Sequence, residues 1–223
     1  MVGTTGWKRC LGAAVCAAVL ALTGCGGLGL GGSSSPSASL APTYDPDRPK
    51  PKAPKGYEWV HSPGAGVLIP VPKSWQPLDK DKLLRGSDSA ALEDAAATVG
   101  MSAADFSDYL TSVDAMAFGP PSKGFAPNIN SIAFDGELPS ATAIAAELKT
   151  AGAKVGTPKT TKAAKIGKAV VVPYTLKAGS RTIHGRTLVI DGSTKIVTIT
   201  VSHLTSKGAD DVAAAILKNT VEF

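Results

Sequence analysis

Hydrophobic and polar residues alternate most regularly in the last third of the chain. Three runs there are rich in Val, Ile and Thr: AVVVPYTLKA (169–178), RTIHGRTLVI (181–190) and KIVTITVSHL (195–204). Short segments around Gly179 and Gly192 separate these runs, as is typical of hairpin turns. The pattern predicts three antiparallel strands joined by hairpins, and a final helix over residues 210–218.

The middle of the chain carries shorter apolar runs between prolines and glycines. Four of them predict strands: YEWVHS (57–62), GVLIPVP (66–72), DAMAF (114–118) and NINSIAF (128–134). Pro70 and Pro72 restrict the second strand to a sheet edge or a strand end, because proline has no N–H to donate. Trp75 follows this strand, and we expect it to lie over the sheet as part of the core.

A helical period replaces the alternation in two further places. Between residues 88 and 114, Ser102 is a candidate N-cap, and apolar residues recur every three to four positions after it. A second helix is predicted from Ser140 to Gly152. Helices before, between and after antiparallel hairpins predict an α+β fold, with an antiparallel sheet flanked by helices in a single domain over 57–223.

The first 24 residues have the pattern of an export signal. Lys8 and Arg9 precede an uncharged run over 11–22 that is rich in Ala, Leu and Val. This run is shorter than the ~20 apolar residues that a membrane-spanning helix needs. The sequence therefore predicts a signal peptide over 1–24 that does not serve as a permanent anchor.

Cys25 stands between two glycines at the end of this signal. The segment Leu22-Thr23-Gly24-Cys25 resembles the lipobox of bacterial lipoproteins, which has an aliphatic residue three positions before the cysteine and a small residue directly before it. The resemblance implies a diacylglyceryl group on Cys25 and cleavage between Gly24 and Cys25, with N-acylation (palmitate or a similar chain) left open. The alternative is an ordinary cysteine beside an ordinary cleavage site. Two acyl chains would hold a protein on a membrane more firmly than one.

The residues after Cys25 predict a flexible tether over 25–56. Glycine and serine dominate its first part and proline its last part, and its apolar side chains are too few to offset the entropy of ordering. Its basic residues either contact anionic head groups or wall polymers or are simply solvated, and the sequence favours the second interpretation. These residues are Arg48, Lys50, Lys52 and Lys55.

Charge and cysteine content change after removal of the signal. The chain has 23 basic and 18 acidic side chains, and loss of Lys8 and Arg9 leaves 21 and 18, a net charge of +3 instead of +5. This small surplus, with few aromatic residues, does not predict nucleic-acid binding. Cys10 and Cys16 leave with the signal and Cys25 becomes a thioether, so the expected domain has no cysteine nucleophile, disulfide or cysteine metal ligand.

The domain carries no motif of a known hydrolase, metal site or phosphate-binding loop. His61, His184 and His203 are far apart in the sequence, and we interpret each as a surface or strand-end residue. Arg181 and Arg186 flank His184 and would disfavour its protonation. We therefore expect no enzyme activity, no cofactor and no metal.

Three groups of charged residues have two possible interpretations each. Asp105 and Asp108 are three apart on a predicted helix, and Asp79 and Asp81 flank a lysine; solvated carboxylates are favoured over acid–base catalysis or calcium binding. Lysines also recur at every third position, a spacing that gives no single strand face and favours a solvated edge over a polyanion site. They are Lys159, Lys162, Lys165 and Lys168.

Several segments together resemble the actinobacterial LpqN-type lipoproteins. They are GVLIPVPKSWQPLD (66–79), NINSIAF (128–134), PSATAIAAELK (139–149), the late hairpins and AILKNTVEF (215–223), in that order. The wider fold resembles the PsbP subunit of photosystem II and the Ran-binding Mog proteins. The resemblance implies an antiparallel sheet flanked by helices that acts as a binding or accessory module, and it brings no catalytic residues to transfer.

Two functions from different classes follow. The first is a lipid-anchored protein on the extracytoplasmic face of the cell membrane, whose domain binds an envelope partner. The second is a carrier for an apolar envelope lipid or another small ligand. A deep apolar pocket would favour the carrier, and a shallow surface with one exposed apolar patch would favour the partner module.

Overall fold

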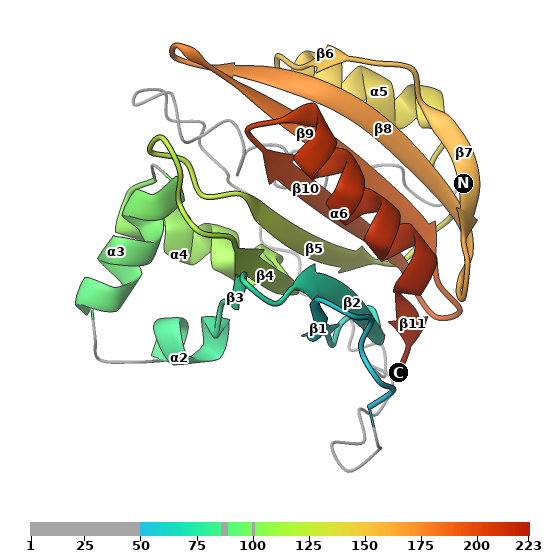
Figure 1. The fold of residues 1–223 in the computed structure, drawn as a ribbon, viewed down its shortest axis with the longest axis horizontal. Helices are drawn as coiled ribbons and strands as arrows, with labels where there is room; N and C mark the ends of the chain where they lie inside the picture. The colour runs from blue at the N-terminus through green and yellow to red at the C-terminus, as the bar shows by residue number, and fades with distance from the viewer. Residues whose placement is uncertain (1–49, 86–88, 100) are drawn as a thin grey trace.

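The computed structural model describes residues 50–85, 89–99 and 101–223 (Figure 1). Its main feature is an eight-stranded sheet in the order β3-β4-β5-β10-β9-β8-β6, in which β7 also pairs with β8. All of its strand pairs are antiparallel. The strands are β3 (Gln76–Pro77), β4 (Ala115–Phe118), β5 (Asn128–Phe134), β6 (Lys154–Val155), β7 (Lys159–Ala163), β8 (Gly167–Ala178), β9 (Arg181–Asp191) and β10 (Ile196–His203).

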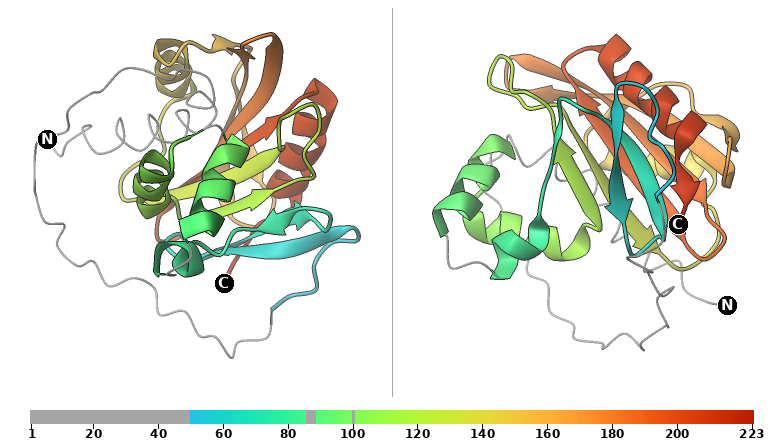
Figure 2. Two further views of the ribbon diagram at one scale, coloured as in Figure 1. Left: turned by 90° about the vertical axis from the view of Figure 1, so that its left-hand side faces the viewer. Right: turned by 60° about the horizontal axis from the view of Figure 1, so that its bottom comes forward.

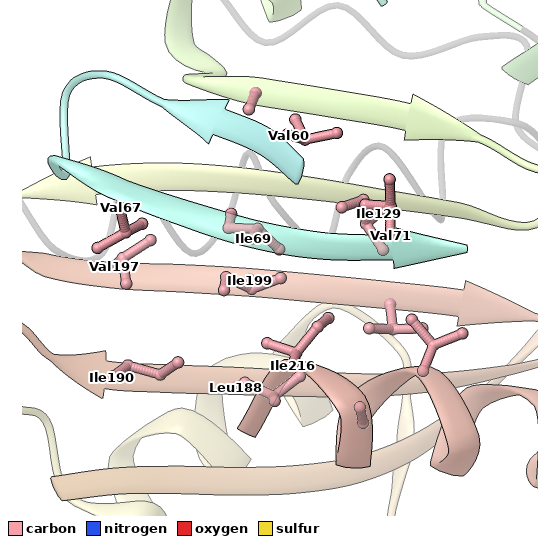
Figure 3. Packing of buried hydrophobic residues seen from close by; sticks show 14 of the residues in the cluster. Val60, Val67, Ile69, Val71, Ile129, Leu188, Ile190, Val197, Ile199 and Ile216 are labelled. Carbon is pink, nitrogen blue, oxygen red and sulfur yellow. The ribbon is translucent and has the colours of Figure 1, made fainter. Parts of the chain in front are cut away.

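A smaller sheet and one helix cover one face of the large sheet. The small sheet has the order β1-β2-β11 and the helix is α6 (Figure 2). Their bounds are β1 (Tyr57–Ser62), β2 (Val67–Pro72), β11 (Val221–Glu222) and α6 (Ser206–Asn219). Ile69 of β2, Ile199 of β10 and Ile216 of α6 meet in one buried cluster, which forms the main core (Figure 3).

Helix α5 (Ala141–Thr150) lies on the opposite face, against β8 and β6. Ile144 and Leu148 of α5 form a second buried cluster with Val170 and Val172 of β8. Three more helices lie beyond β4, and α3 packs against α4. They are α2 (Lys80–Arg85), α3 (Ser89–Val99) and α4 (Ala103–Ser112). The α+β class, with an antiparallel sheet flanked by helices, is therefore confirmed.

The helix starts follow the expected capping chemistry. Ser102 accepts a hydrogen bond from the Asp105 N–H (3.1 Å), and Ser140 accepts one from the Ala143 N–H (3.2 Å). The prediction for α6 was wrong at its start, because the helix begins at Ser206 and not at Asp210. Gly208, in the first turn of α6, lies directly against the His203 ring. Any larger residue would place a Cβ in collision with that ring.

The prolines of β2 lie toward the end of the strand, which is one of the two positions that the sequence allowed. β2 is the central strand of the small sheet and not an edge strand. However, β11 pairs only with Val67 and Leu68, so the part of β2 that contains Pro70 and Pro72 has β1 as its one partner. The strand accepts both prolines because they lie where no second ladder is formed.

The predicted signal peptide (1–24), Cys25 and most of the predicted tether lie outside the described residues. The last residues of the tether contact the domain. The Pro51 carbonyl accepts from Trp59 Nε1 (2.6 Å), and the Gly56 carbonyl accepts from the Lys73 N–H (3.0 Å). Within the described part of the chain, no helix combines the length and apolar character needed to cross a bilayer.

Candidate functional site

A pocket of about 460 Å³ lies beside β3 and β4, and we call it the Phe118 pocket. It is lined by Ser74, Gln76, Pro77, Leu78, Ala95, Phe118, Gly119, Pro120, Pro121 and Ala126. None of these side chains carries a charge, and most of them are apolar. The volume lies within the range of ~300–1,000 Å³ that is usual for sites of small organic ligands.

Prolines shape the walls of this pocket. Pro77 ends β3 after two residues, and Pro120-Pro121 follow the end of β4, because proline cannot extend a ladder of backbone hydrogen bonds. The chain then reverses through a tight turn, in which the Ser122 and Phe125 backbones exchange hydrogen bonds of 2.9 and 3.0 Å. The strand ends therefore leave a hollow between the sheet edge and the loop.

The loop after β4 packs against the indole ring of Trp75. A Cβ on Gly119 would lie 2.7 Å from the indole Nε1 of Trp75, so only glycine allows the backbone to approach this closely. Trp75 is itself buried in the main core cluster, as predicted. The pocket is thus held in place by the core and not by the surface loop alone.

Helices support the third wall of the pocket, to which α3 contributes Ala95. Leu78, Ala95 and Phe118 are partly buried against a cluster that contains Phe106 and Leu110 of α4. The sequence analysis predicted strands on both sides of residues 119–127 and no pocket between them. The sequence signal for this pocket is the concentration of proline on both sides of short strands. This signal predicts where the strands end, but it does not show that the two strand ends lie side by side.

The structure brings two of the three histidines together. His184 and His203 are not isolated from each other, because they are directly paired residues on β9 and β10. His203 Nδ1 accepts a hydrogen bond from the Thr205 N–H (3.1 Å). Burial lowers the pKa of His203, and the nearby His184 lowers it further. His61 lies elsewhere, on β1, with its ring edge-on to Phe223.

A buried arginine lies on the same face as this histidine pair. Arg186 donates from Nε to Asp210 (2.7 Å), from one terminal nitrogen to Ser206 Oγ (2.8 Å) and from the other to the Gly185 carbonyl (2.7 Å). The hydrogen bond from Arg186 lowers the pKa of Asp210. Every nitrogen of the guanidinium group has a partner within the chain, which is the arrangement expected of a structural arginine.

Two hollows flank Arg186, with volumes of about 300 and 410 Å³. His184, Ser206 and Tyr174 line the first, and Asp210 lines the second. The Ser206 hydroxyl donates to Asp210 Oδ2 (3.2 Å), a carboxylate that Arg186 already holds. Within the described ranges, no three histidine, cysteine or acidic side chains gather as a metal site would require.

The remaining charged candidates lie at helix ends and at the sheet edge. Asp105 bonds to Ser102 within the α4 cap, and Asp79 Oδ1 accepts from the Lys82 N–H (3.0 Å) at the start of α2. Asp81 faces Arg85 at 3.8 Å on the surface. The four lysines at every third position are all exposed, on β7, at the start of β8 and between them.

No family model matches the chain, and no curated protein matches it. The chain is similar to the solution structure of cyanobacterial PsbP (CyanoP) from Synechocystis sp. PCC 6803, with 12% identity and a TM-score of 0.49, over 86% of this chain and 98% of that chain. It is also similar to the crystal structure of LpqN, involved in cell envelope biogenesis of Mycobacterium tuberculosis. There the identity is 14% and the TM-score 0.39, over 74% of this chain and 89% of that chain.

The resemblance in the sequence named PsbP and LpqN, and a structure of each is among the similar structures. What either protein binds or assembles with is a property of that protein.

Proposed function

We propose that this chain is an exported lipoprotein, anchored in the cell membrane through acyl chains on Cys25, whose domain acts on the extracytoplasmic face as a binding or accessory module of the cell envelope. The observation that carries the anchor is the segment Leu22-Thr23-Gly24-Cys25 at the end of an export-type signal. The residues after Cys25 supply a tether that lets the domain reach partners near the membrane.

The Phe118 pocket supports binding as the task of the domain. Its lining offers apolar surface and no side chain that titrates near neutral pH. Such a lining gains affinity by removing apolar area from water, at about 25 cal/mol per Å². We propose that the domain binds without turnover.

The pocket also favours a second candidate, a carrier for an apolar envelope lipid or another small ligand. Its volume of about 460 Å³ is that of a small-ligand site, and it is bordered by a sheet edge, a loop and Ala95 of α3. A protein partner would instead need a broader face, with about 800 Å² buried on each side.

The anchor is tested with Cys25→Ala in the full chain, expressed in a bacterium that processes lipoproteins. We expect this variant to lose incorporation of an alkyne-labelled palmitate and to be either released or left unprocessed. Cys10→Ala and Cys16→Ala serve as matched controls, since both residues leave with the signal. A Cys25→Ala chain that is cut normally and still partitions into the detergent phase would contradict the anchor.

The binding site is tested by photocrosslinking in the intact envelope. Benzoylphenylalanine replaces Phe118 in the pocket, and Lys162 on the exposed edge strand β7 as a control. We expect an adduct specific to position 118, whose mass separates a protein partner from a lipid. Identical adducts at both positions, or none at position 118, would show that the pocket is not the binding site.

A further inference from the structure

Helix α6 begins against the side chain of His203, the last residue of β10. Thr205 is the N-cap of the helix, and its hydroxyl accepts a hydrogen bond from the Gly208 N–H (3.1 Å). Ser140 makes the same kind of capping bond at the start of α5. At α6, however, the cap has a further partner, which is the imidazole ring of His203.

The Nδ1 atom of His203 contacts Thr205 twice. It accepts a hydrogen bond from the Thr205 N–H (3.1 Å), and the Thr205 hydroxyl lies equally close to it (3.1 Å). A ring nitrogen that accepts from a backbone N–H has a free lone pair, so the neutral ring carries its proton on Nε2. The Thr205 hydroxyl therefore donates to Nδ1 while it accepts from Gly208, and the three residues form one chain of hydrogen bonds.

The His203 ring has no room to turn away from this chain of hydrogen bonds. A Cβ on Gly208 would collide with three atoms of the ring, so the ring lies directly on the backbone of the first turn of α6. Burial lowers the pKa of His203 and the neighbouring His184 lowers it further, whereas Asp211 acts in the other direction. The ring is therefore neutral near pH 7 and serves the cap as an acceptor.

A proton on Nδ1 would disrupt the cap. The protonated nitrogen has no lone pair, so the Thr205 N–H loses its acceptor and faces another N–H group. The imidazolium would also lie at the N-terminus of a 14-residue helix, where the helix dipole disfavours a positive charge. The Thr205 hydroxyl could accept from the new N–H group of His203, but it cannot replace the lost partner of the Thr205 backbone.

The charged and titratable side chains around His203 do not offset this cost. They are His184 and Arg186 of β9, and Lys207, Asp210 and Asp211 of α6. Both carboxylates already have cationic partners, since Asp210 bonds to Arg186 and Asp211 bonds to Lys207. β5, on the other side of β10, contributes no charged side chain. A proton on His203 therefore meets mainly positive or neutralised neighbours.

We propose that His203 makes the first turn of α6 a proton-sensitive switch. At neutral pH the ring holds the cap closed. When Nδ1 takes up a proton from solvent, Thr205 loses its acceptor and the turn from Ser206 to Gly208 opens. This switch is independent of the Phe118 pocket and goes beyond the proposed binding function.

Opening of this turn changes one of the two hollows beside Arg186. Ser206 lines the hollow of about 300 Å³ together with His184, and its hydroxyl accepts from Arg186 (2.8 Å). Asp210 lies one helical turn later, and its own bond to Arg186 does not depend on the cap. The rest of the helix stays in place through buried residues such as Ile216. Acid should therefore widen this hollow without releasing α6 from the sheet.

The first test is hydrogen exchange of the cap amides, followed by NMR in the chain from residue 25 onward. Cys25→Ser leaves this chain without an acyl anchor, and it keeps every described residue. The readout is the protection factor of the Thr205 and Gly208 amides, which corrects for the intrinsic effect of pH on exchange. Between about pH 7.5 and about pH 5.5 we expect it to fall roughly fivefold, as for the loss of one ordinary hydrogen bond.

The cap of α5 provides an internal control in the same sample. The Ala143 N–H donates to Ser140 Oγ (3.2 Å), and no histidine takes part in that bond. Its protection factor should be the same at both pH values. Protection of the Thr205 and Gly208 amides that is equally independent of pH overturns the proposal.

The second test removes the titrating group and keeps an acceptor. In His203→Asn, the side-chain carbonyl takes about the place of Nδ1 and accepts from the Thr205 N–H at every pH. The change in protection between the two pH values should therefore disappear. His184→Asn is the matched control, because it removes the paired ring of β9 and leaves the cap intact, so the change should persist. The opposite result for the two variants would show that His203 does not control the turn.

A titration of the native residues gives an answer even if His203→Asn fails to fold. The NMR signals of the His203 ring and of the Thr205 amide should change with one common midpoint, below the 6.5 of an unperturbed histidine. A Thr205 midpoint that follows the His184 ring instead overturns the proposal. So does exchange of the Ile199 amide in step with the cap, because opening would then be global and not confined to the first turn of α6.

Discussion

The two faces of β10 are equally buried, but they are built differently. Val197, Ile199 and Val201 point to one side and pack in the cluster that contains β2 and α6. Thr198 and Thr200 point to the other side and keep hydroxyls without partners. One face therefore stabilises the fold, and the other holds polar groups whose hydrogen bonds the chain does not supply. The two faces are alike in burial and differ in whether the buried side chains have hydrogen-bonding groups without partners.

Polar residues on the α6 face sharpen this contrast. Arg186 is a charged side chain on β9 and more costly to bury than a hydroxyl, yet all of its nitrogens have partners in Asp210, Ser206 and Gly185. The same strand presents Thr187 to the opposite face with none. The chain therefore supplies partners for the buried charge on one face, whereas the hydroxyl of Thr187 on the opposite face has no partner in the chain.

The largest effect should come from the packed face. Ile199→Ala removes a fully buried side chain from the main cluster and should cost about 2–5 kcal/mol of unfolding free energy, measured by denaturant titration. Thr200→Val at the next position changes a residue of equal burial and should cost nothing. A small loss for Ile199→Ala, below about 1 kcal/mol, would show that the α6 face is not the stabilising one.

A second, smaller loss is expected at the buried arginine. Asp210→Ala leaves Arg186 without its carboxylate and should cost about 1.5 kcal/mol, at the low end for charged hydrogen bonds because Asp210 is more than half exposed. The bond from Arg186 lowers the pKa of Asp210 below its usual 3.8, so this stabilisation is present above that pH and is lost as the pH falls below it.

The neighbouring Asp211 provides the matched control. It pairs with the exposed Lys207 one helical turn earlier (2.6 Å), and surface pairs of this kind contribute little. Asp211→Ala should therefore leave the denaturation midpoint almost unchanged. Equal losses for Asp210→Ala and Asp211→Ala would mean that Arg186 does not depend on its carboxylate partner.

On the threonine face of β10, removal of a hydroxyl should raise the free energy of unfolding. Thr198→Val should raise stability by about 0.5–1 kcal/mol, because it removes a buried hydroxyl with no partner and keeps a β-branched side chain in the strand. Ser62→Ala is the opposite case, since the Ser62 hydroxyl donates to Asp114 and accepts from Ser131 Oγ (3.0 Å). Both variants are compared by thermal unfolding. If Thr198→Val loses stability as Ser62→Ala does, the two faces of β10 do not differ in the way described.

Much of the fold follows from local sequence signals, and the unpredicted parts depend on distant partners. The hairpins around Gly179 and Gly192 and the caps at Ser102 and Ser140 are set within a few residues. The two-residue strands β3, β6 and β11 were not predicted, because a strand that short exists only through the strand it pairs with. The helix α2 and the edge strand β7 were missed as well, since neither carries a strong apolar period.

The candidate site and the buried threonines were less predictable than the fold. The alternation in KIVTITVS shows that Thr198 and Thr200 share a face, but solvent would satisfy the same pattern on an ordinary exposed strand. The pairing of His184 with His203 follows from the turn at Gly192, which fixes the register of β9 and β10, so this contact could have been found. The Phe118 pocket could not, because its walls come from segments separated by dozens of residues.

The smallest expected effect is a loss of stability at low pH. It depends on His203, the last residue of β10, whose side chain lies on the face that packs against α6. Burial lowers the pKa of His203, and His184 opposite lowers it further, although Asp211 acts in the other direction. Arg186 and Asp210 lie on the same face, and Lys207 follows in the first turn of α6. Since the unfolded chain takes up this proton more readily than the folded chain, stability should fall as the pH drops through 6.5.

The measurement is the unfolding free energy at about pH 7.5 and about pH 5.5, for the native chain and for His203→Gln. The variant should show a smaller loss between the two values. His61 lies in the other sheet, and burial lowers its pKa too, so His61→Gln should remove a separate share of the loss and the two effects should add. If His61→Gln abolishes the whole loss and His203→Gln changes nothing, the His203 ring is not buried against Gly208 of α6, and the packed face of β10 ends before residue 203.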